Sequence, residues 1–480
     1  MHNRKTVFFQ GQIETALKKF KADLDLRLKK VFAVLRIQSH LTGAGIRKCE
    51  GYLPLELFYV LTNLAFMHLK TVHDLISRPL KSLIQAGKDT FYRFKNSEWS
   101  WQSFHGRFLQ YLGKRLQWDS TEKENCFILD TSILAKRGKR FENLSFVYDP
   151  SQGKTVTGYE ILVLGLLTPR NFFPLDVGHH VSKTAPAGAG TTKPLRPRGN
   201  LARRLHEATA LTKPELAVKM LKRARRQGIA ALYLLVDAWF TSAKFFLAVR
   251  HLGLEAIGRL KRDRTRFQED GAWYTLDELY QRHKHRLVKD PALGLSLVQV
   301  PVTCGNGLKA GIVLAKGYKE PQLESRPQDR KKAEPSWTAF LSTAQGLAAR
   351  EVVLKYIGRW SIEVFFKEAK QRLGLGKEQG LSFAAQVFSI TLAFCRYSLL
   401  AYLLEQEAQP QTIGSMFRQL EAESGALTYL TRLWRYFASL IKNCLDTLGR
   451  LCPPGPSFRA YLDIIANTFK EFSPLQGCET

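Results

Sequence analysis

The chain has 480 residues, and lysine plus arginine outnumber aspartate plus glutamate by 72 to 42, which gives a formal net charge of +30. Such a surplus favours a polyanionic partner, and nucleic acid before an anionic membrane surface, because lysine and arginine neutralise phosphates. The length allows two to four domains, and a hydrophobic share of 45% permits a buried core.

Composition also argues against several kinds of site. The seven cysteines are scattered without a Cys-x-x-Cys pair, so we expect buried thiols in a reducing compartment and neither a disulfide framework nor a zinc site. The apolar stretches 51–69 and 382–404 contain Glu56 and Arg396, and charges are costly inside a bilayer, so both are predicted to be buried helices. The first residues lack a signal-peptide pattern.

The first third of the chain changes from helical to strand-like patterns. Residues 1–118 are expected to be mostly helical, because apolar residues recur at three- and four-residue spacing, as in ETALKKFKADLDLRLKKVFAVL. Residues 126–130 (CFILD), 159–168 (YEILVLGLLT) and 172–178 (FFPLDVG) have the length and composition of strands. The Gly/Pro/Thr-rich segment 182–200 is predicted to be a loop.

Helices and strands alternate after this loop. Thr212-Lys-Pro-Glu is a capping box with an early proline, so a helix starts there and ends at Gly228. A buried strand within 229–240, a helix over 241–252 and a strand over 254–260 follow, which together predict an α/β layer.

The remainder divides into two regions. Residues 260–343 are polar and basic and contain strand-like pieces, LGLSLVQVPVTC and LKAGIVLA. From residue 346 onward the pattern is helical to the end.

Two aspartates end apolar runs of strand length. Asp130 follows CFIL and Asp237 follows LYLLV. Ligands gather at the carboxyl ends of strands in an α/β sheet, so carboxylates there are well placed for chemistry. For either residue alone, the alternative is an aspartate that only begins a turn.

A third acid lies in the apolar segment YIGRWSIEVFFKEAK, residues 356–370. An ideal helix advances about 100° per residue. On such a helix one sector of about 80° contains five polar residues, here called the stripe: Tyr356, Arg359, Glu363, Lys367 and Lys370. The stripe is either a structural ion-pair ladder around the glutamate or one polar face of a buried helix that meets a ligand.

If these three acids converge, they form a site of hard oxygen ligands. Such a site suits Mg²⁺ or Mn²⁺ better than zinc. Two such ions about 3.5–4 Å apart activate a nucleophilic oxygen and stabilise the leaving oxygen in phosphoryl transfer. A basic stripe beside them would hold backbone phosphates.

The spacing of the stripe is specific. Tyr356, Arg359, Glu363 and Lys370 are separated by two, three and six residues. This resembles the Y-(2)-R-(3)-E-(6)-K signature of the DDE insertion-sequence transposases of the "insertion sequence four" family.

The resemblance covers roughly residues 120–405 and includes ILDTSILAKRGKRFENLS and LLVDAWFTSAKFF around the two aspartates. It implies an α/β fold, with an RNase H-like catalytic core and a β-rich insertion, flanked by helical N- and C-terminal regions. The implied boundaries are a helical region at 1–118 that is a candidate for binding DNA ends, the core at 119–260 and 344–405, the insertion at 261–343, and a helical region at 406–480 that is a candidate for dimerisation.

The resemblance also implies roles. Asp130, Asp237 and Glu363 would be catalytic and would bind Mg²⁺ or Mn²⁺, two ions in all, with Asp130 on the first strand, Asp237 just after the fourth and Glu363 on a later helix.

The family's signature residues grip DNA near the cleaved end, which assigns DNA contact to Tyr356, Arg359 and Lys370. Lys367 joins them from the helical wheel alone. A tryptophan of the family's insertion can stack on a flipped base, but the sequence assigns this role to none of the nearby tryptophans, Trp239, Trp273 and Trp337.

The implied reaction is metal-dependent cleavage at transposon ends and strand transfer to target DNA, by a homodimer on terminal inverted repeats. The expected location is the bacterial cytoplasm, at the nucleoid. The alternatives are a catalytically inactive, transposase-derived DNA-binding protein and another RNase H-like nuclease.

Weaker signals compete with these assignments. Asp176 is a rival third acid, expected at a sheet edge. His179 and His180 suggest a metal, but neighbours on a strand point to opposite faces. The basic helix 219–226 is either a DNA contact or a solvated face.

Overall fold

The computed structural model describes most of the chain, namely residues 26–47, 51–67, 69, 71–77, 86–138, 140–149, 152–181, 199–319, 337–409 and 411–424. The predicted loop at 182–200 and the C-terminal helical region lie largely outside these residues, as do residues 1–25. The chain forms two compact units, of which the smaller comprises Met1–Val34, Phe66–Gln85 and Gln419–Thr480. Within it the structure describes helices α2 (Leu26–Val34) and α5 (Val72–Ser77).

The larger unit comprises Leu35–Ala65 and Ala86–Arg418 and contains all the strands of the described residues. Five strands form its central sheet in the order β4-β3-β1-β5-β6. Their bounds are β1 (Cys126–Ala135), β3 (Lys154–Leu167), β4 (Phe172–His180), β5 (Tyr233–Val236) and β6 (Glu255–Arg259).

The strand directions identify the fold. β3 is antiparallel to both β1 and β4, whereas β5 is parallel to β1 and β6 is parallel to β5. This is the strand order of an RNase H-like core, so the predicted α/β class is confirmed. The added strand β2 (Ser145–Asp149) extends the sheet by pairing with the first half of β3.

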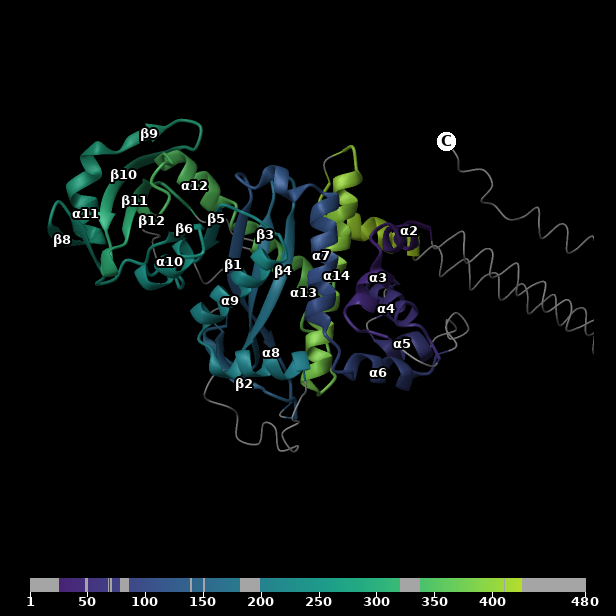
Figure 1. Ribbon diagram of the computed structural model, residues 1–480. Helices are drawn as coiled ribbons and strands as arrows, with labels where there is room; N and C mark the ends of the chain where they lie inside the picture. Colours follow the sequence, from purple (N-terminus) through teal and green to yellow (C-terminus); the bar gives the residue numbers. More distant parts are fainter. Residues whose placement is uncertain are drawn as a thin grey trace, which may run out of the picture. The chain divides into compact units, whose positions relative to one another are not determined.

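Helices cover the sheet (Figure 1). Helices α8 (Gly199–Ala210) and α9 (Lys213–Arg226) follow β4 in the chain and pack on it, and α10 (Ala243–Arg250) connects β5 to β6. The capping box predicted before α9 is present, because the Thr212 N–H donates to Glu215 Oε2 at 2.9 Å. Leu216, Met220 and Leu221 of α9 are buried, as the four-residue spacing of its apolar face requires.

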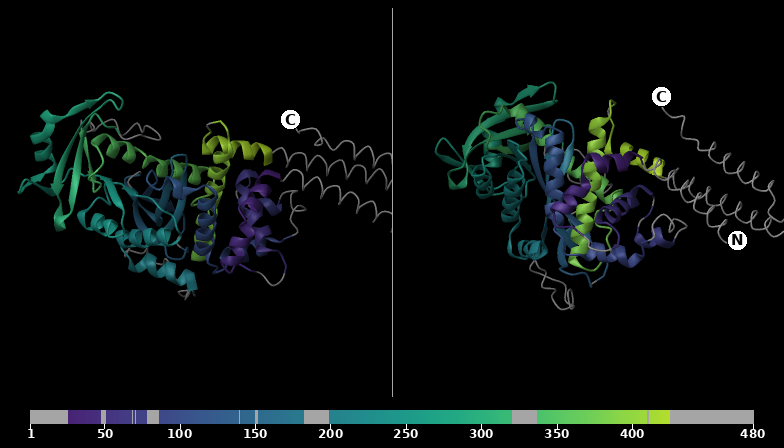
Figure 2. Two further views of the ribbon diagram at one scale, coloured as in Figure 1. Left: turned by 45° about the horizontal axis from the view of Figure 1, so that its top comes forward. Right: turned by 45° about the vertical axis from the view of Figure 1, so that its right-hand side comes forward.

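Other helices of this unit also pack on the core sheet. Strand β4 is contacted by α7, α13 and α14, and Figure 2 shows α14 running alongside α7. The bounds are α3 (Ile37–Gly43), α4 (Pro54–Asn63), α6 (Lys88–Asn96), α7 (Trp101–Arg115), α12 (Ala349–Ile357), α13 (Trp360–Gln371) and α14 (Phe383–Gln406).

The strand-rich stretch before α12 continues the core sheet. Strand β12 pairs antiparallel with β6, and the order then runs β12-β11-β10-β7-β8, with β9 on β10. The bounds are β7 (Arg266–Glu269), β8 (Ala272–Thr275), α11 (Leu276–His283), β9 (Val288–Asp290), β10 (Leu295–Thr303), β11 (Lys309–Lys316) and β12 (Trp337–Ser342). Trp337 stacks on Tyr280 of α11 at 4.1 Å between ring centroids, which fixes that helix to the added strands.

Helix α14 is the core helix of the unit. It is long and apolar enough to cross a membrane by length and composition, yet 89% of its most apolar window is buried inside the protein. Arg396 within it is 7% exposed and donates from Nε to Thr62 O at 3.0 Å and from Nη1 to Leu373 O at 2.6 Å. Backbone carbonyls therefore accept hydrogen bonds from the guanidinium of Arg396, which makes its burial in this apolar helix tolerable.

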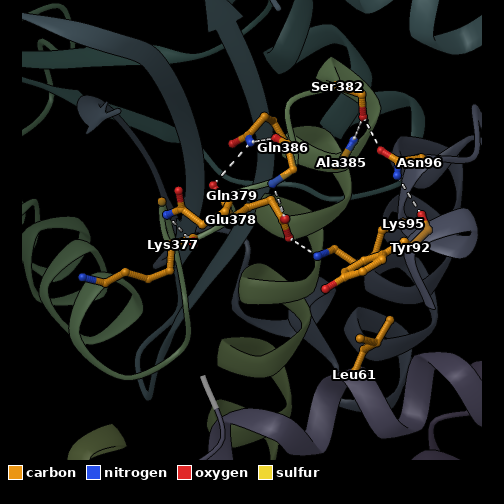
Figure 3. Close-up of polar contacts among 12 residues, drawn as sticks. Leu61, Tyr92, Lys95, Asn96, Lys377, Glu378, Gln379, Ser382, Ala385 and Gln386 are labelled. Carbon is orange, nitrogen blue, oxygen red and sulfur yellow. Dashed lines mark hydrogen bonds and ion pairs between the residues drawn. The ribbon is translucent and has the colours of Figure 1, made fainter. Parts of the chain in front are cut away.

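The loop between α13 and α14 is held by polar contacts (Figure 3). Glu378 pairs with Lys95 of α6 at 2.6 Å, and Ser382 Oγ donates to Asn96 at 2.5 Å. Gln386 of α14 donates to the Gly380 carbonyl at 2.6 Å. These contacts tie the loop after α13 to α6 and to the start of α14.

Candidate active site

The two aspartates that end apolar runs lie side by side. In the parallel pair β1–β5, Leu129 is opposite Val236, so the next residue on each strand, Asp130 and Asp237, continues the same register. Neighbouring strands lie about 4.8 Å apart. The two carboxylates therefore start from adjacent backbone positions at the carboxyl end of β5.

Local backbone contacts fix both aspartates. The Thr131 N–H donates to Asp130 Oδ1 at 2.7 Å. After β5 the chain turns, and the N–H groups of Trp239 and Phe240 donate to Asp237 Oδ1 at 3.1 and 3.3 Å. Asp237 thus has the turn-forming role that the sequence left open, and the turn also holds its carboxylate in one orientation.

The segment 356–370 is two helices, not the single helix on which the helical wheel was drawn. Helix α12 ends at Ile357, and α13 begins at Trp360 after a tight turn at Gly358 and Arg359. An added Cβ at Gly358 would lie 2.7 Å from Leu167 Cδ2 of β3. The close approach of this turn to the sheet therefore favours glycine, since any larger residue would press on Leu167.

Arg359 joins the third acid to the first. Its Nη2 donates to Glu363 Oε1 at 2.5 Å, and its Nη1 donates to Asp130 Oδ2 at 3.1 Å. The Arg359 side chain is 6% exposed, whereas those of Asp130 and Glu363 are 15% and 28% exposed. Glu363 on α13 therefore lies close to Asp130, and a buried guanidinium bridges the two carboxylates.

The electrostatics of Asp130 reflect this crowding. Burial raises the pKa of the Asp130 carboxyl from 3.8 to about 7. The charge of Arg359 lowers this pKa, and the charges of Asp237 and Glu363 raise it again. The charges of Asp237 and Glu363 thus disfavour ionisation of Asp130, and a cation among the three side chains would relieve this repulsion.

The donor set fits a hard divalent ion by its chemistry, since carboxylate oxygens are the usual ligands of Mg²⁺ and Mn²⁺. Within the described residues, however, no group of three or more His, Cys, Asp or Glu side chains is arranged to hold a metal ion. Arg359 supplies the positive charge that Asp130 and Glu363 need in this structure. The ligand types are present, and an arginine takes the cation's electrostatic role.

The other stripe residues are placed differently. Tyr356 is 2% exposed and packs against Phe340 of β12 at 4.6 Å between ring centroids. Contact between Tyr356 and DNA stays a prediction, and it requires this side chain to be uncovered. Lys367 and Lys370 are half-buried on α13, and burial lowers the pKa of Lys370 while the charge of Asp149 raises it.

The competing candidates have structural partners. Asp176 lies on β4, which pairs with β3 alone among the described strands, and its Oδ2 accepts from Arg223 Nε at 2.7 Å. His179 is 3% exposed, and burial lowers its pKa well below the usual value, so it stays neutral. His180 Nδ1 lies 3.1 Å from Glu160 Oε2 instead of sharing a metal with His179.

One polar cluster beside Asp237 was missed from the sequence. Trp239 is 47% exposed, and Lys213 Nζ lies 4.6 Å from its ring centroid. Glu160 on β3 accepts from Lys213 Nζ at 2.5 Å, which holds the ammonium group in place. The capping box before α9 predicted the helix that carries Lys213, but the partner strand is 53 residues away in sequence.

Two protein-family models match this chain. A model described as "DDE superfamily endonuclease" matches residues 54–290, and one described as "Transposase DDE domain" matches residues 204–399. Together these matches support a DDE transposase. Neither specifies the "insertion sequence four" family or its signature, which stay predictions.

The other two comparisons add less. No curated protein matches the chain. Among solved structures, a chain of the "Drosophila P element transposase strand transfer complex" is 10% identical, covers 83% of this chain and 90% of its own length, and has a TM-score of 0.24. The fold is therefore argued from strand order and not from this likeness.

Proposed function

We propose that this chain is a cut-and-paste DNA transposase of the "insertion sequence four" type, which cleaves at transposon ends and transfers the strand to target DNA. One observation carries the proposal. Asp130 lies within β1 and Asp237 directly follows the adjacent parallel strand β5, one residue beyond the pair Leu129–Val236, and Arg359 links Glu363 on α13 to Asp130. The two family matches support the same class.

The chain's own residues divide the work. Asp130, Asp237 and Glu363 would hold Mg²⁺ or Mn²⁺, two ions in all, and these ions would activate the attacking oxygen and stabilise the leaving oxygen when bound.

The DNA contacts come from the same helices. Arg359 and Lys370, together with Lys367, would pair with backbone phosphates near the cleaved end, because charge-assisted contacts to phosphate fix register without reading sequence. Tyr356 would join them once uncovered. The proposed partners are terminal inverted repeats, target DNA and a second copy of the chain, and the proposed location is the bacterial cytoplasm at the nucleoid.

Cleavage assays on the gene's own flanking DNA test the proposal. The substrate is a fragment that carries the gene with the sequence on both sides, incubated with Mg²⁺ or Mn²⁺. Asp130→Asn, Asp237→Asn and Glu363→Gln should each reduce cleavage by roughly a thousandfold or more while DNA binding is retained. Glu368→Gln is the matched control, because Glu368 lies on the same helix and pairs with Arg372 at 2.7 Å instead.

Three outcomes separate the alternatives. Normal cleavage by any of the three acid variants contradicts the site. A wild-type protein that binds DNA but never cuts it is the inactive, transposase-derived DNA-binding protein. A protein that cuts without joining strands is another RNase H-like nuclease.

A further inference from the structure

The position of Arg359 raises a question that the proposed function leaves open. Its guanidinium is nearly buried and donates to one oxygen of Asp130 and one of Glu363. These are two of the three carboxylates that the proposed reaction needs as metal ligands. The same oxygens therefore have two possible partners, an arginine of the same chain and a divalent ion.

The two partners exclude one another for simple reasons. A guanidinium and a metal ion both attract carboxylate oxygens, and two cations beside the same oxygens repel each other in a site that little water reaches. The described carboxylates also form no metal-binding group while Arg359 bridges two of them. A metal ion would therefore have to displace the arginine from at least one carboxylate.

The surroundings favour the arginine-bound state. Arg359 lies in the turn that joins α12 to α13, so its backbone is fixed at both ends by helices. The Tyr356 ring lies 5.6 Å from the guanidinium carbon and packs in turn on Phe340 of β12. An aromatic face and two carboxylates thus hold the guanidinium in place.

We propose that Arg359 is an internal counter-ion that closes the metal site of the DNA-free protein, and that divalent metal binds only as Arg359 leaves Asp130 and Glu363. This rests on the proposed function, which makes the acids metal ligands. A phosphate of bound DNA offers the released guanidinium another anion. Arg359 is accordingly a positioning residue that couples metal loading to DNA engagement.

Binding of Mn²⁺ to the DNA-free protein tests the proposal, with the free ion followed by its electron paramagnetic resonance signal. The buffer is mildly alkaline, so that carboxyls released from Arg359 are ionised. Removing the competing cation in Arg359→Ala should tighten Mn²⁺ binding by about tenfold or more. Arg359→Gln, which keeps a polar side chain of similar length, should change it in the same direction.

The matched control is Arg372→Ala. Arg372 lies just beyond the end of α13 and pairs with Glu368, four residues before it, at 2.7 Å, so this variant removes an equivalent charge pair outside the site. Its Mn²⁺ affinity should equal that of the wild type. Unchanged or weaker Mn²⁺ binding in both folded Arg359 variants overturns the proposal.

A measurement on the wild type covers the case in which neither variant folds. Phenylglyoxal modifies accessible guanidinium groups, and mass spectrometry of the digested protein reports the rate at Arg359. That rate should rise at least severalfold when Mn²⁺ is added, since the side chain is only 6% exposed while paired. An equal rate with and without bound Mn²⁺ overturns the proposal.

These results are separable from the proposed function. If the acid variants lose cleavage while Arg359→Ala gains no Mn²⁺ affinity, the transposase assignment stands and the counter-ion role fails. If Arg359→Ala binds Mn²⁺ more tightly but the wild type cuts no DNA, the reverse holds.

Discussion

His105 on α7 is a histidine that the fold keeps neutral. It is 5% exposed, and burial lowers its pKa to about 4, although the nearby charge of Asp176 raises it. The unfolded chain takes up this proton at its ordinary pKa of about 6.5. Above pH 6.5 the shifted pKa does not affect the free energy of unfolding, because His105 is neutral in both states. As pH falls from about 6.5 to 4, the unfolded chain is protonated first and the folded state loses stability.

We therefore predict that acid sensitivity depends on His105. Between pH 6.5 and 4, the free energy of unfolding should fall by about 3 kcal/mol less in His105→Gln than in the wild type, since each pKa unit corresponds to about 1.4 kcal/mol. Urea unfolding across that pH range measures it. His251→Gln, at an exposed histidine, is the control. Parallel pH profiles of wild type and His105→Gln would contradict the prediction.

At the candidate active site, the sequence was a better guide to the identity of the residues than to the contacts between them. Asp130 and Asp237 were identifiable because each ends an apolar run, although only Asp237 comes at the end of its strand and Asp130 lies within β1. The bridge from Arg359 to Asp130 was not predictable, because it spans 229 residues of chain. The helical wheel predicted an ion pair between Arg359 and Glu363, four residues later, and that pair is present.

Among the elements, Arg396 connects three segments. It lies on α14 and donates to the carbonyls of Leu61, Thr62 and Leu373, which belong to α4 and to the loop after α13. Two of these carbonyls are at the end of α4, where helices leave their last carbonyls without internal partners. A single side chain thus caps one helix and anchors the loop that follows another.

Arg396→Met should therefore destabilise the protein strongly. It leaves three buried carbonyls without this donor, at a cost of about 3 kcal/mol or more. Denaturant unfolding measures the change. Arg372→Met, which removes an i, i+4 pair with partly exposed partners, should cost less than about 1 kcal/mol. Equal effects of the two substitutions would show that the carbonyl contacts contribute little.

Most helices and strands were predictable from the sequence, and each wrong prediction has a specific structural reason. The helix after Thr212 and the strand before Asp237 follow from capping and apolar length, whereas the predicted strand end at Asp130 was wrong, because β1 continues to Ala135. The break between α12 and α13 does not, because Gly358 approaches Leu167, which lies on a strand far away in sequence. Sequence periodicity reports one helix face and cannot report what approaches it.

At the scale of the whole molecule, one sheet joins two regions that look separate in sequence. The polar stretch at 260–343 was predicted to be an insertion, and its strands continue the core through the pairing of β12 with β6. Sequence predicted these strands but not their edge, because antiparallel pairing between distant strands leaves no local pattern. As a result, Tyr356 at the end of α12 packs on Phe340 of β12, a strand of the predicted insertion.

The net charge of +30 leads to the last prediction, which concerns binding and not chemistry. A protein that neutralises six or more phosphates should show log K falling with log salt at a slope of about −5 or steeper. Fluorescence anisotropy with a duplex of arbitrary sequence, in a chelator, measures this slope. Asp130→Asn should share it, because the acids make no phosphate contacts.

Lys370 provides the residue-specific arm of the same experiment. If its half-buried ammonium reaches one phosphate, Lys370→Ala should lower the slope by about 0.9. Lys244→Ala, at an exposed lysine on α10, separates this effect from the loss of any one charge. A slope near zero in the wild type, or equally tight binding to phosphatidylserine vesicles, would mean that the surplus charge serves another anionic surface. In that case the three acids would need a different substrate, because phosphoryl transfer on DNA requires that the backbone first be held.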